Sequence, residues 1–265
     1  MATANVTPKA GVPRPKKASQ LKGALGINML IFGYGGSGKT TLACTAQDTE
    51  HGRDVLLLDV DRGVESVSDR DDVDVLQPSQ WKTSTPDEPS LYSILQWIKQ
   101  QTPGPEGSAR YKTVVFDSLT SIYDLILKDI LRASPTPDMP SQPEYGKANM
   151  ALQQLIADMR ALGDLGVNTI FIAHAKEETD QGSNMVLIRL ALTPGVTSNV
   201  MRTVDHVGYL QVDTGSGNRK LILKNSPRII AKFRQPRSGP QLPLELLNPN
   251  MATIIEHVRK AKGQN

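Results

Sequence analysis

The sequence predicts an α/β fold, in which a doubly wound, mostly parallel sheet is flanked by helices. Apolar runs of strand length alternate with segments of helical spacing through the first two thirds of the chain. This alternation is typical of parallel sheets, because parallel strands are joined by crossovers that contain a helix. Two of the apolar runs end in aspartate, and a glycine-rich loop follows another run. Right-handed crossovers bring the carboxyl ends of the strands to one edge, so we expect the binding site there.

Length and composition limit the classes of protein. The chain has 265 residues, which suits one large α/β domain with appendages, or at most two small domains. Its single cysteine, Cys44, excludes an internal disulfide framework and a cysteine-built zinc site, and we expect it to be buried in a helix. No apolar run approaches the roughly 20 residues of a membrane span, and the first residues lack the apolar core of a signal peptide. We therefore expect a soluble, cytoplasmic protein.

We divide the chain into three parts. Residues 1–24 form a basic arm that is rich in Pro, Lys and Ala, and we expect it to be disordered. Residues 25–248 form the core, and residues 249–265 form a C-terminal helix and tail. A second basic segment has seven cations and no acid: Arg219, Lys220, Lys224, Arg228, Lys232, Arg234 and Arg237. Such segments suit a polyanion, and the alternatives are a solvated tail and an ordinary basic face.

The elements of the core are expected in the following order. Residues 27–47 are predicted to form a strand, a loop and a helix. Continuous apolar runs predict further buried strands, which we place at residues 54–61, 111–120 and 167–175. Apolar residues at helical spacing predict helices, which we place at residues 91–101, 121–133, 144–166 and 251–262. Proline- and glycine-rich segments predict loops at 102–109 and 134–143. From residue 184 onward, short strand-like runs alternate with turns.

The loop after the first strand has a phosphate-binding sequence. "GYGGSGKTT" matches the pattern G-x-x-x-x-G-K-[ST], and it lies between a predicted strand and a predicted helix. Glycines let the backbone curl so that its N–H groups point at phosphates. Lys39 is expected to reach the β- and γ-phosphates, and the hydroxyl of Thr40 is expected to bind Mg²⁺. We expect nucleotide binding by Gly33, Gly35, Gly36, Ser37, Gly38, Lys39, Thr40 and Thr41.

Asp117 ends the predicted strand in "VVFDS". An acid at this position can hold the hydration shell of Mg²⁺ beside Thr40, so we assign Asp117 to the metal and to catalysis. The alternative is that Asp117 or Ser118 caps the helix that follows. Both roles are compatible with each other.

Two acids, Asp59 and Asp61, end the strand in "LLLDVD". Alternation along a strand puts them on the same side. We expect Asp59 to be a buried structural acid and Asp61 to be the general base that deprotonates an attacking water, with Glu65 as a competitor. The alternative is that these acids cap the next helix or turn.

His174 ends the third buried strand, in "IFIAHA". At this position it could contact the γ-phosphate and report hydrolysis, whereas the alternative is a core histidine with its hydrogen bonds satisfied. The other histidines, His51, His206 and His257, show no metal-ligand spacing, so we expect no metal site beyond Mg²⁺.

With these strand ends in this order, the chain resembles the RecA-type core ATPases. More narrowly, it resembles the phage ATPases of RecA-core type that act in single-strand annealing recombination. The likeness covers roughly residues 27 to 235 and rests on "IFGYGGSGKTTLA", "YKTVVFDSLTSI", "EYGKANMALQQLIADMR", "TIFIAHAKEE" and "AKFR". It implies a RecA-like P-loop NTPase fold, the ligands ATP and Mg²⁺, and DNA-stimulated hydrolysis of ATP to ADP and phosphate. The second-strand acid of that superfamily is usually glutamate, whereas Asp61 here is one methylene shorter.

The resemblance also implies an oligomer with shared active sites. In RecA-like and DnaB-like oligomers, a Lys-x-Arg pair on a late strand reaches the nucleotide of the neighbouring subunit. Lys232 and Arg234 in "RIIAKFRQP" match this pattern, and alternation puts them on one face. Such cations neutralise charge that builds up in the transition state. We therefore expect a homo-oligomeric ring or filament, and the alternative is a basic edge strand that prevents aggregation.

The segment "LTPGVTSNVMRTVDH" corresponds to a DNA-binding loop in RecA-like proteins. We expect its polar residues to bind single-stranded DNA through phosphates, without reading bases. The residues that we assign are Thr197, Ser198, Asn199 and Arg202. The alternative is an ordinary turn and helix N-terminus.

These observations predict an ATP-dependent recombination protein that binds single-stranded DNA as an oligomer and promotes strand annealing or exchange. We expect it to act in a phage-infected bacterial host, with a single-strand-binding protein as a further partner and without a membrane. The alternative is a DnaB-like helicase core or a helicase loader, although a helicase would normally carry an extra N-terminal domain. A small-molecule kinase is disfavoured, because the late basic segment lacks the helically spaced arginines of a substrate lid.

Overall fold

The structure is a computed structural model. It describes residues 26–83, 88–101, 110–235 and 241–263. The predictions made for the basic arm, for the loop at 102–109 and for Arg237 concern residues outside these ranges.

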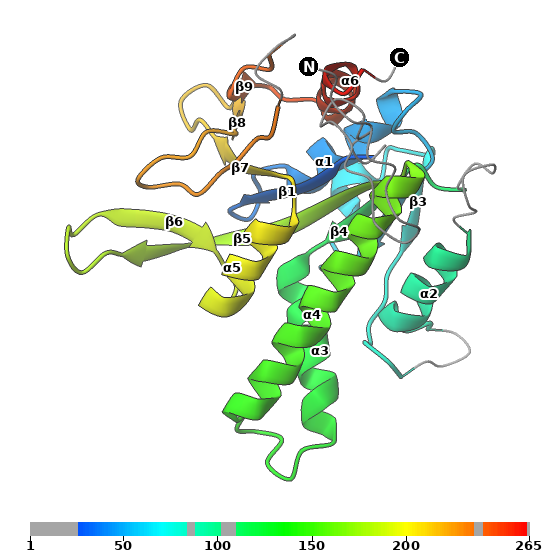
Figure 1. The fold of residues 1–265 in the computed structure, drawn as a ribbon, viewed down its shortest axis with the longest axis vertical. Helices are drawn as coiled ribbons and strands as arrows, with labels where there is room; N and C mark the ends of the chain where they lie inside the picture. Colours follow the sequence, from blue (N-terminus) through cyan, green and yellow to red (C-terminus); the bar gives the residue numbers. More distant parts are fainter. Residues whose placement is uncertain (1–25, 84–87, 102–109, 236–240, 264–265) are drawn as a thin grey trace, which may run out of the picture.

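A sheet of nine strands, counted over the described residues, forms the centre of the molecule (Figure 1). Its order is β3-β2-β4-β5-β1-β7-β8-β9, and β6 pairs with the distal part of β5. The six strands from β3 to β7 run parallel, and the pairings of β6, β8 and β9 are antiparallel. The strands are β1 (Asn28–Gly33), β2 (Val55–Asp59), β3 (Val73–Leu76), β4 (Thr113–Asp117), β5 (Asn168–Thr179), β6 (Val186–Leu190), β7 (His206–Val212), β8 (Arg219–Ile222) and β9 (Glu245–Leu247).

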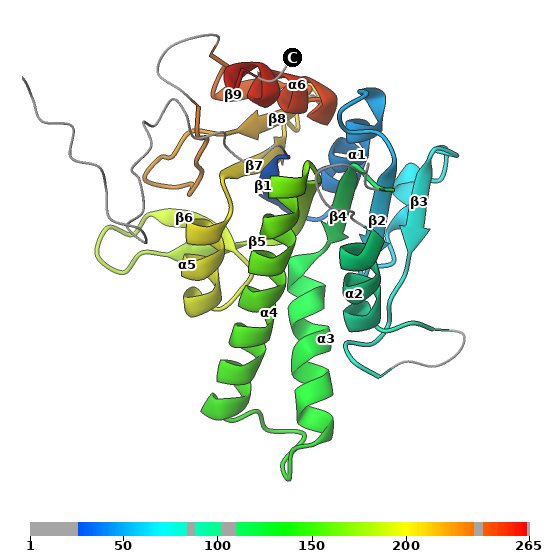
Figure 2. The same cartoon turned by 45° about the vertical axis from the view of Figure 1, so that its right-hand side comes forward.

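Helices cover both faces of the sheet, which confirms the predicted fold class (Figures 1 and 2). The α-helices are α1 (Lys39–Cys44), α2 (Leu91–Gln101), α3 (Leu119–Arg132), α4 (Gln142–Leu162), α5 (Pro194–Thr203) and α6 (Met251–Ala261). Short 3₁₀ turns are η2 (Thr45–Asp48), η3 (Val64–Val67) and η4 (Gly163–Leu165). No helix in the described part of the chain combines the length and the hydropathy that crossing a bilayer requires.

Alternation along the strands creates two hydrophobic cores. Leu30 and Phe32 of β1 belong to one core, which includes residues of α2, α3, α4 and α5. Met29 and Ile31 belong to the other core, which includes residues of α1 and α6. Cys44 is fully buried in this second core, as predicted, and burial raises the pKa of its thiol to about 12.

Local sequence signals explain where the helices begin. Ser118 caps α3 by accepting a hydrogen bond from the backbone N–H of Ser121. Ser141 and Glu144 form a capping box at the start of α4. Asn250 caps α6, and the apolar residues of α6 recur at intervals of three and four and are buried against the sheet.

Three expectations about elements need correction. The strand β3 was not predicted, because its apolar positions alternate with an acid and do not form a continuous run. The strand β5 continues five residues past His174, since its polar end pairs with β6. The expected late strand around Lys232 is a single β-bridge between Lys232 and Val207. Side chains alternate between two faces only along a strand, so the expectation that Lys232 and Arg234 share one face does not apply here.

Candidate functional site

The carboxyl ends of four parallel strands meet at one edge of the sheet. The strand β5 lies between β1 and β4. Its register places His174 opposite Gly33, and the register of β2 with β4 places Asp59 opposite Asp117. A cavity of about 300 Å³ opens at this edge. It is lined by Gly35, Gly36, Gly38, Lys39, Thr40, Thr41, Asp61, Gly63, Ser66, Asp117, His174 and Arg219.

The backbone of the glycine-rich loop has the conformation that its glycines permit. Gly36 and Gly38 have φ of 73° and 87°, in the left-handed region that favours glycine. A Cβ atom built on Gly35 or Gly36 would meet no atom within 4 Å, so the loop leaves open space beside it. At Gly33 a Cβ atom would lie 2.4 Å from the carbonyl oxygen of Leu210, so this glycine is required by the close packing of β1 on β7.

The polar groups of this loop fit an anionic ligand. The side chain of Lys39 is buried, and its Nζ donates a hydrogen bond to the backbone oxygen of Tyr34, 2.8 Å away. Burial lowers the pKa of Lys39, whereas the charges of Asp117 and Asp61 act in the opposite direction. The hydroxyl of Ser37 is buried and has no hydrogen-bond partner among the described residues. Phosphate oxygens would satisfy both groups.

Thr40 and Asp117 lie together, as the sequence predicts. The hydroxyl of Thr40 donates to Oδ2 of Asp117 over 2.5 Å. Burial raises the pKa of Asp117 to about 6, although the hydrogen bond from Thr40 opposes this shift. Hydroxyl and carboxylate oxygens are ligands that Mg²⁺ prefers, and Mg²⁺ commonly takes few protein ligands together with substrate phosphates. The described residues contain no cluster of three or more His, Cys, Asp or Glu side chains that could hold a metal.

Asp61 and His174 form a hydrogen-bonded pair inside the cavity. Nε2 of His174 lies 2.8 Å from Oδ2 of Asp61, and the hydroxyl of Ser118 donates to Oδ1 over 3.1 Å. Burial alone would raise the pKa of Asp61, but hydrogen bonds with His174, Ser121 and Ser118 outweigh it and lower this pKa. Asp61 is therefore a carboxylate near neutral pH, with its orientation fixed by neighbours from two other elements.

The remaining acids of this region take different positions. Asp59 is fully buried, and its carboxylate accepts hydrogen bonds from Gly63 N, Val64 N and Gln77 Nε2, which confirms the structural role expected for it. The strand β2 ends at Asp59, so the expected alternation does not extend to Asp61. Glu65 lies on η3 and does not line the cavity.

The structure does not bring Lys232 and Arg234 into this cavity. Lys232 forms a β-bridge with Val207, and Val207 pairs with Leu30 of β1. Leu30 lies three residues before the end of β1, so this bridge is away from the edge with the cavity. Its Nζ donates to the backbone oxygen of Met201. Nη1 of Arg234 lies 2.7 Å from Oδ1 of Asp205. Their predicted contact with a neighbouring subunit stays a prediction.

The residues assigned to DNA binding lie on a helix and not on a loop. Thr193 occupies the N-cap of α5 and Pro194 its first position, a helix-start signal that the sequence contained. Ser198 and Arg202 are exposed, and Nη2 of Arg202 donates to Oδ1 of Asn199. Thr197 and Asn199 are partly buried. The four residues stay a predicted DNA site.

Three residues that line the cavity, Gly63, Ser66 and Arg219, were not assigned to it from the sequence, and Arg219 is the only cation among them. Arg219, the first residue of β8, donates from Nε to the backbone oxygen of Ser37 over 3.2 Å. It was seen only as one of several cations in a basic segment. Nothing local in the sequence indicates that it reaches a loop 182 positions earlier in the chain.

Comparison with known proteins gives one family match. Residues 25–235 match the AAA domain family. No curated protein sequence matches the chain. Among solved structures, a KaiC-like protein from the hyperthermophilic archaeon Pyrococcus horikoshii OT3 is similar, with 13% sequence identity and a TM-score of 0.38. That alignment covers 78% of this chain and 82% of the archaeal one.

Proposed function

This chain belongs to the AAA domain family and is an ATPase of the P-loop class. From that premise we propose that it acts as an oligomer. The oligomer hydrolyses ATP, binds single-stranded DNA and promotes strand annealing or exchange. The hydrolytic part of this proposal is supported by the geometry of the cavity. The DNA part is supported by the sequence resemblance to phage annealing ATPases and by the exposed polar side of α5.

The observation that carries the hydrolytic proposal is the placement of Asp61. Its carboxylate has a lowered pKa, lines the same cavity as the glycine-rich loop, and is oriented by His174 and Ser118. A carboxylate held in this way can orient a water molecule and accept its proton as the water oxygen attacks the γ-phosphorus, while the bond from that phosphorus to the bridging oxygen breaks and ADP leaves. His174 then responds to the charge on Asp61, because the two side chains share a hydrogen bond.

The other residues of the cavity bind the substrate. The open loop at Gly35 and Gly36 presents backbone N–H groups to phosphates, and Lys39 can exchange the carbonyl of Tyr34 for a phosphate oxygen. Thr40 and Asp117 would hold Mg²⁺, which when bound supplies positive charge against the phosphate oxygens.

The proposed oligomer has active sites completed by Lys232 and Arg234 of a neighbouring subunit. The side chain of Arg234 is 59% exposed even though it pairs with Asp205, so a neighbour's phosphates are able to compete for it. Arg234→Ala is expected to reduce ATP hydrolysis by about 1,000-fold or more, the effect of losing an arginine finger. Nucleotide affinity at protomer concentrations below assembly should stay within about threefold of wild type.

A matched control is Arg228→Ala, which removes another exposed cation from the same segment. Turnover is measured by phosphate release over a range of protein concentrations. Equal losses of affinity and turnover in Arg234→Ala would assign Arg234 to its own chain or to folding.

The DNA proposal is tested by adding single-stranded DNA to the wild-type protein. We expect the ATPase rate to rise, the DNA to be retained at moderate salt, and retention to fall steeply with salt. Ser198 and Arg202 on α5 can be replaced together by alanine, which should weaken retention equally for DNA of different sequences. If DNA neither stimulates hydrolysis nor is retained, the proposal fails. If a forked duplex is separated and complementary strands are not annealed, the helicase alternative replaces it.

A further inference from the structure

The cation Arg219 lies directly against the glycine-rich loop. Its Nε donates to the backbone oxygen of Ser37, and it is the nearest atom, at 2.4 Å, to a Cβ built on Gly38. The guanidinium therefore covers the turn at Ser37 and Gly38, whose backbone precedes Lys39. Arg219 also lines the cavity that contains Lys39, Asp61 and Asp117.

The backbone of Arg219 is held in place by hydrogen bonds on both sides. Its N–H donates to Oδ1 of Asn248 over 3.0 Å, and its carbonyl oxygen accepts from Asn248 N over 2.6 Å. The amide of Asn248 also donates to Oδ1 of Asn218. A tight turn precedes β8, in which Oδ1 of Asp213 accepts from the backbone of Gly215. Hydrogen bonds of its own backbone hold Arg219 in place, so replacing its side chain should leave the local fold intact.

Adjacent cations of β8 have different charge environments. Nζ of Lys220 lies 2.5 Å from Oε2 of Glu245 and so forms an ion pair. Arg219 forms no ion pair within the described ranges, and its side-chain hydrogen bond there is to the neutral carbonyl of Ser37. A guanidinium has five N–H donors in a planar fork that matches phosphate oxygens. Arg219 thus places an uncompensated cation with free donors beside an anion-binding loop.

We propose that Arg219 contacts the phosphates of the nucleotide bound by its own chain. This inference rests on the proposed nucleotide site and adds to it a cation that acts within one subunit. It differs from the role proposed for Arg234, because Arg219 needs no neighbour to reach the site. A single protomer would then already neutralise part of the phosphate charge through Arg219. Assembly would add Lys232 and Arg234 of the neighbouring subunit.

The test compares Arg219→Ala with Lys220→Ala, which removes the neighbouring paired cation. Equilibrium binding of ATP and ADP is measured in Mg²⁺ with each variant, at protein concentrations at which wild type is a single protomer. We expect Arg219→Ala to weaken ATP binding by about 10- to 100-fold, the range for a lost hydrogen bond to a charged group. Lys220→Ala should stay within threefold of wild type. Arg219→Lys, which keeps the charge and loses the fork, should lie between wild type and Arg219→Ala.

Thermal unfolding without nucleotide separates binding from folding. The expected result is an unchanged unfolding temperature in Arg219→Ala, and Arg219→Gln serves as a second variant if alanine prevents folding. A loss of affinity below threefold for both nucleotides in the folded variant overturns the inference. If wild type itself binds neither ATP nor ADP, the proposed function fails instead, so the two failures are distinguishable.

Discussion

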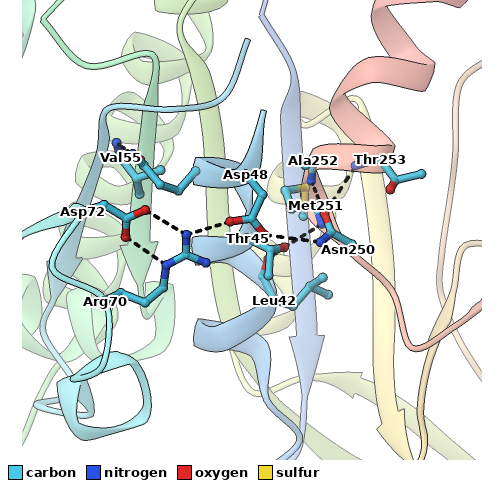
Figure 3. Close-up of polar contacts among 11 residues, drawn as sticks. Leu42, Thr45, Asp48, Val55, Arg70, Asp72, Asn250, Met251, Ala252 and Thr253 are labelled. Atoms are coloured by element: carbon cyan, nitrogen blue, oxygen red, sulfur yellow. Dashed lines mark hydrogen bonds and ion pairs between the residues drawn. The ribbon is translucent and has the colours of Figure 1, made fainter. Parts of the chain in front are cut away.

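Two charged clusters lie at opposite ends of the segment formed by α1 and η2, and they balance their charges in different ways. At the η2 end, Arg70 lies between two carboxylates: Nη2 is 2.7 Å from Oδ1 of Asp48, and Nε is 3.1 Å from Oδ1 of Asp72 (Figure 3). These hydrogen bonds raise the pKa of Arg70, and Arg70 lowers the pKa of Asp72. The cluster is closed, because each charge already has a partner.

The cluster at the glycine-rich loop is open. Lys39 is held by a backbone carbonyl, the hydroxyl of Ser37 has no partner among the described residues, and burial raises the pKa of Asp117 to about 6. Folding places these groups together although they do not neutralise one another. This arrangement has a cost that a phosphate and a cation would remove. The comparison teaches that an incompletely satisfied cluster indicates a ligand site, whereas a closed cluster supports the fold.

The closed cluster also connects two parts of the fold. Oγ1 of Thr45 accepts from the backbone N–H of Met251 over 2.7 Å, and Nδ2 of Asn250 lies 3.4 Å from Oδ2 of Asp48 (Figure 3). Asn250 also caps α6 through the backbone of Ala252. The start of α6 is therefore attached to η2, and the ion pairs of Arg70 extend this attachment to Asp72, the residue before β3.

Between the two clusters, the larger effect is expected at Asp61, which lines the cavity of the open cluster. Asp61→Asn keeps the size of the side chain and removes its ability to accept a proton. We expect ATP hydrolysis to fall by about 100- to 10,000-fold, the contribution typical of a general base. Phosphate release measures the rate, and equilibrium binding should show ATP affinity close to wild type.

The control for this prediction is Glu65→Gln on η3, which is expected to hydrolyse ATP at nearly the wild-type rate. If Glu65→Gln is inactive and Asp61→Asn is active, the base has been assigned to the wrong acid. The open cluster would then lack its main catalytic group.

An intermediate effect is expected at His206, which belongs to neither cluster and lies beside Arg234. Nδ1 of His206 accepts a hydrogen bond from the backbone of Arg234, and burial lowers the pKa of His206 to about 4. The unfolded chain binds a proton near pH 6.5, whereas the folded chain does so only near pH 4. The free energy of unfolding should therefore fall by about 3 kcal/mol from this group as pH decreases through that window.

Urea denaturation at pH 7 and pH 4.5 measures this dependence. His206→Asn keeps an acceptor for the same N–H and should lose less stability over this range than wild type. An identical decrease in both proteins would show that His206 is not held neutral by burial.

The smallest expected effect lies in the closed cluster itself. Arg70→Ala should lower the free energy of unfolding by about 1 kcal/mol, since partly exposed ion pairs contribute little. Its ATP affinity and turnover should match wild type, because Arg70 does not line the cavity of the glycine-rich loop. Denaturation and phosphate release measure the two properties. A loss of turnover with unchanged stability would break the distinction between the two clusters.

Short-range sequence patterns predicted much of the fold and part of the site. The glycine-rich loop lies between an apolar strand and a helix, and Asp117 directly follows a buried run. Both signals come from neighbouring residues, so they can be read without knowing the tertiary structure. The helix α2 was predicted with the bounds that the structure has, because its apolar spacing is regular.

Residues whose positions depend on distant parts of the chain could not be predicted. Arg219 reaches Ser37 only because β7 pairs with β1 and β8 pairs with β7. Lys232 and Arg234 match a motif, but their partners Met201 and Asp205 come from α5 and the residues after it. A charge pattern in sequence does not indicate which charges become paired after folding.

The central claim is that the open cluster is the site of the ATP phosphates, and a calorimetric titration of ATP with Mg²⁺ tests it most directly. The titration compares wild type with Lys39→Ala, while Arg70→Ala from the closed cluster serves as the control. We predict one ATP bound per chain in wild type and in Arg70→Ala, and a loss of affinity of at least tenfold in Lys39→Ala. Equal affinity of Lys39→Ala and wild type would contradict the account.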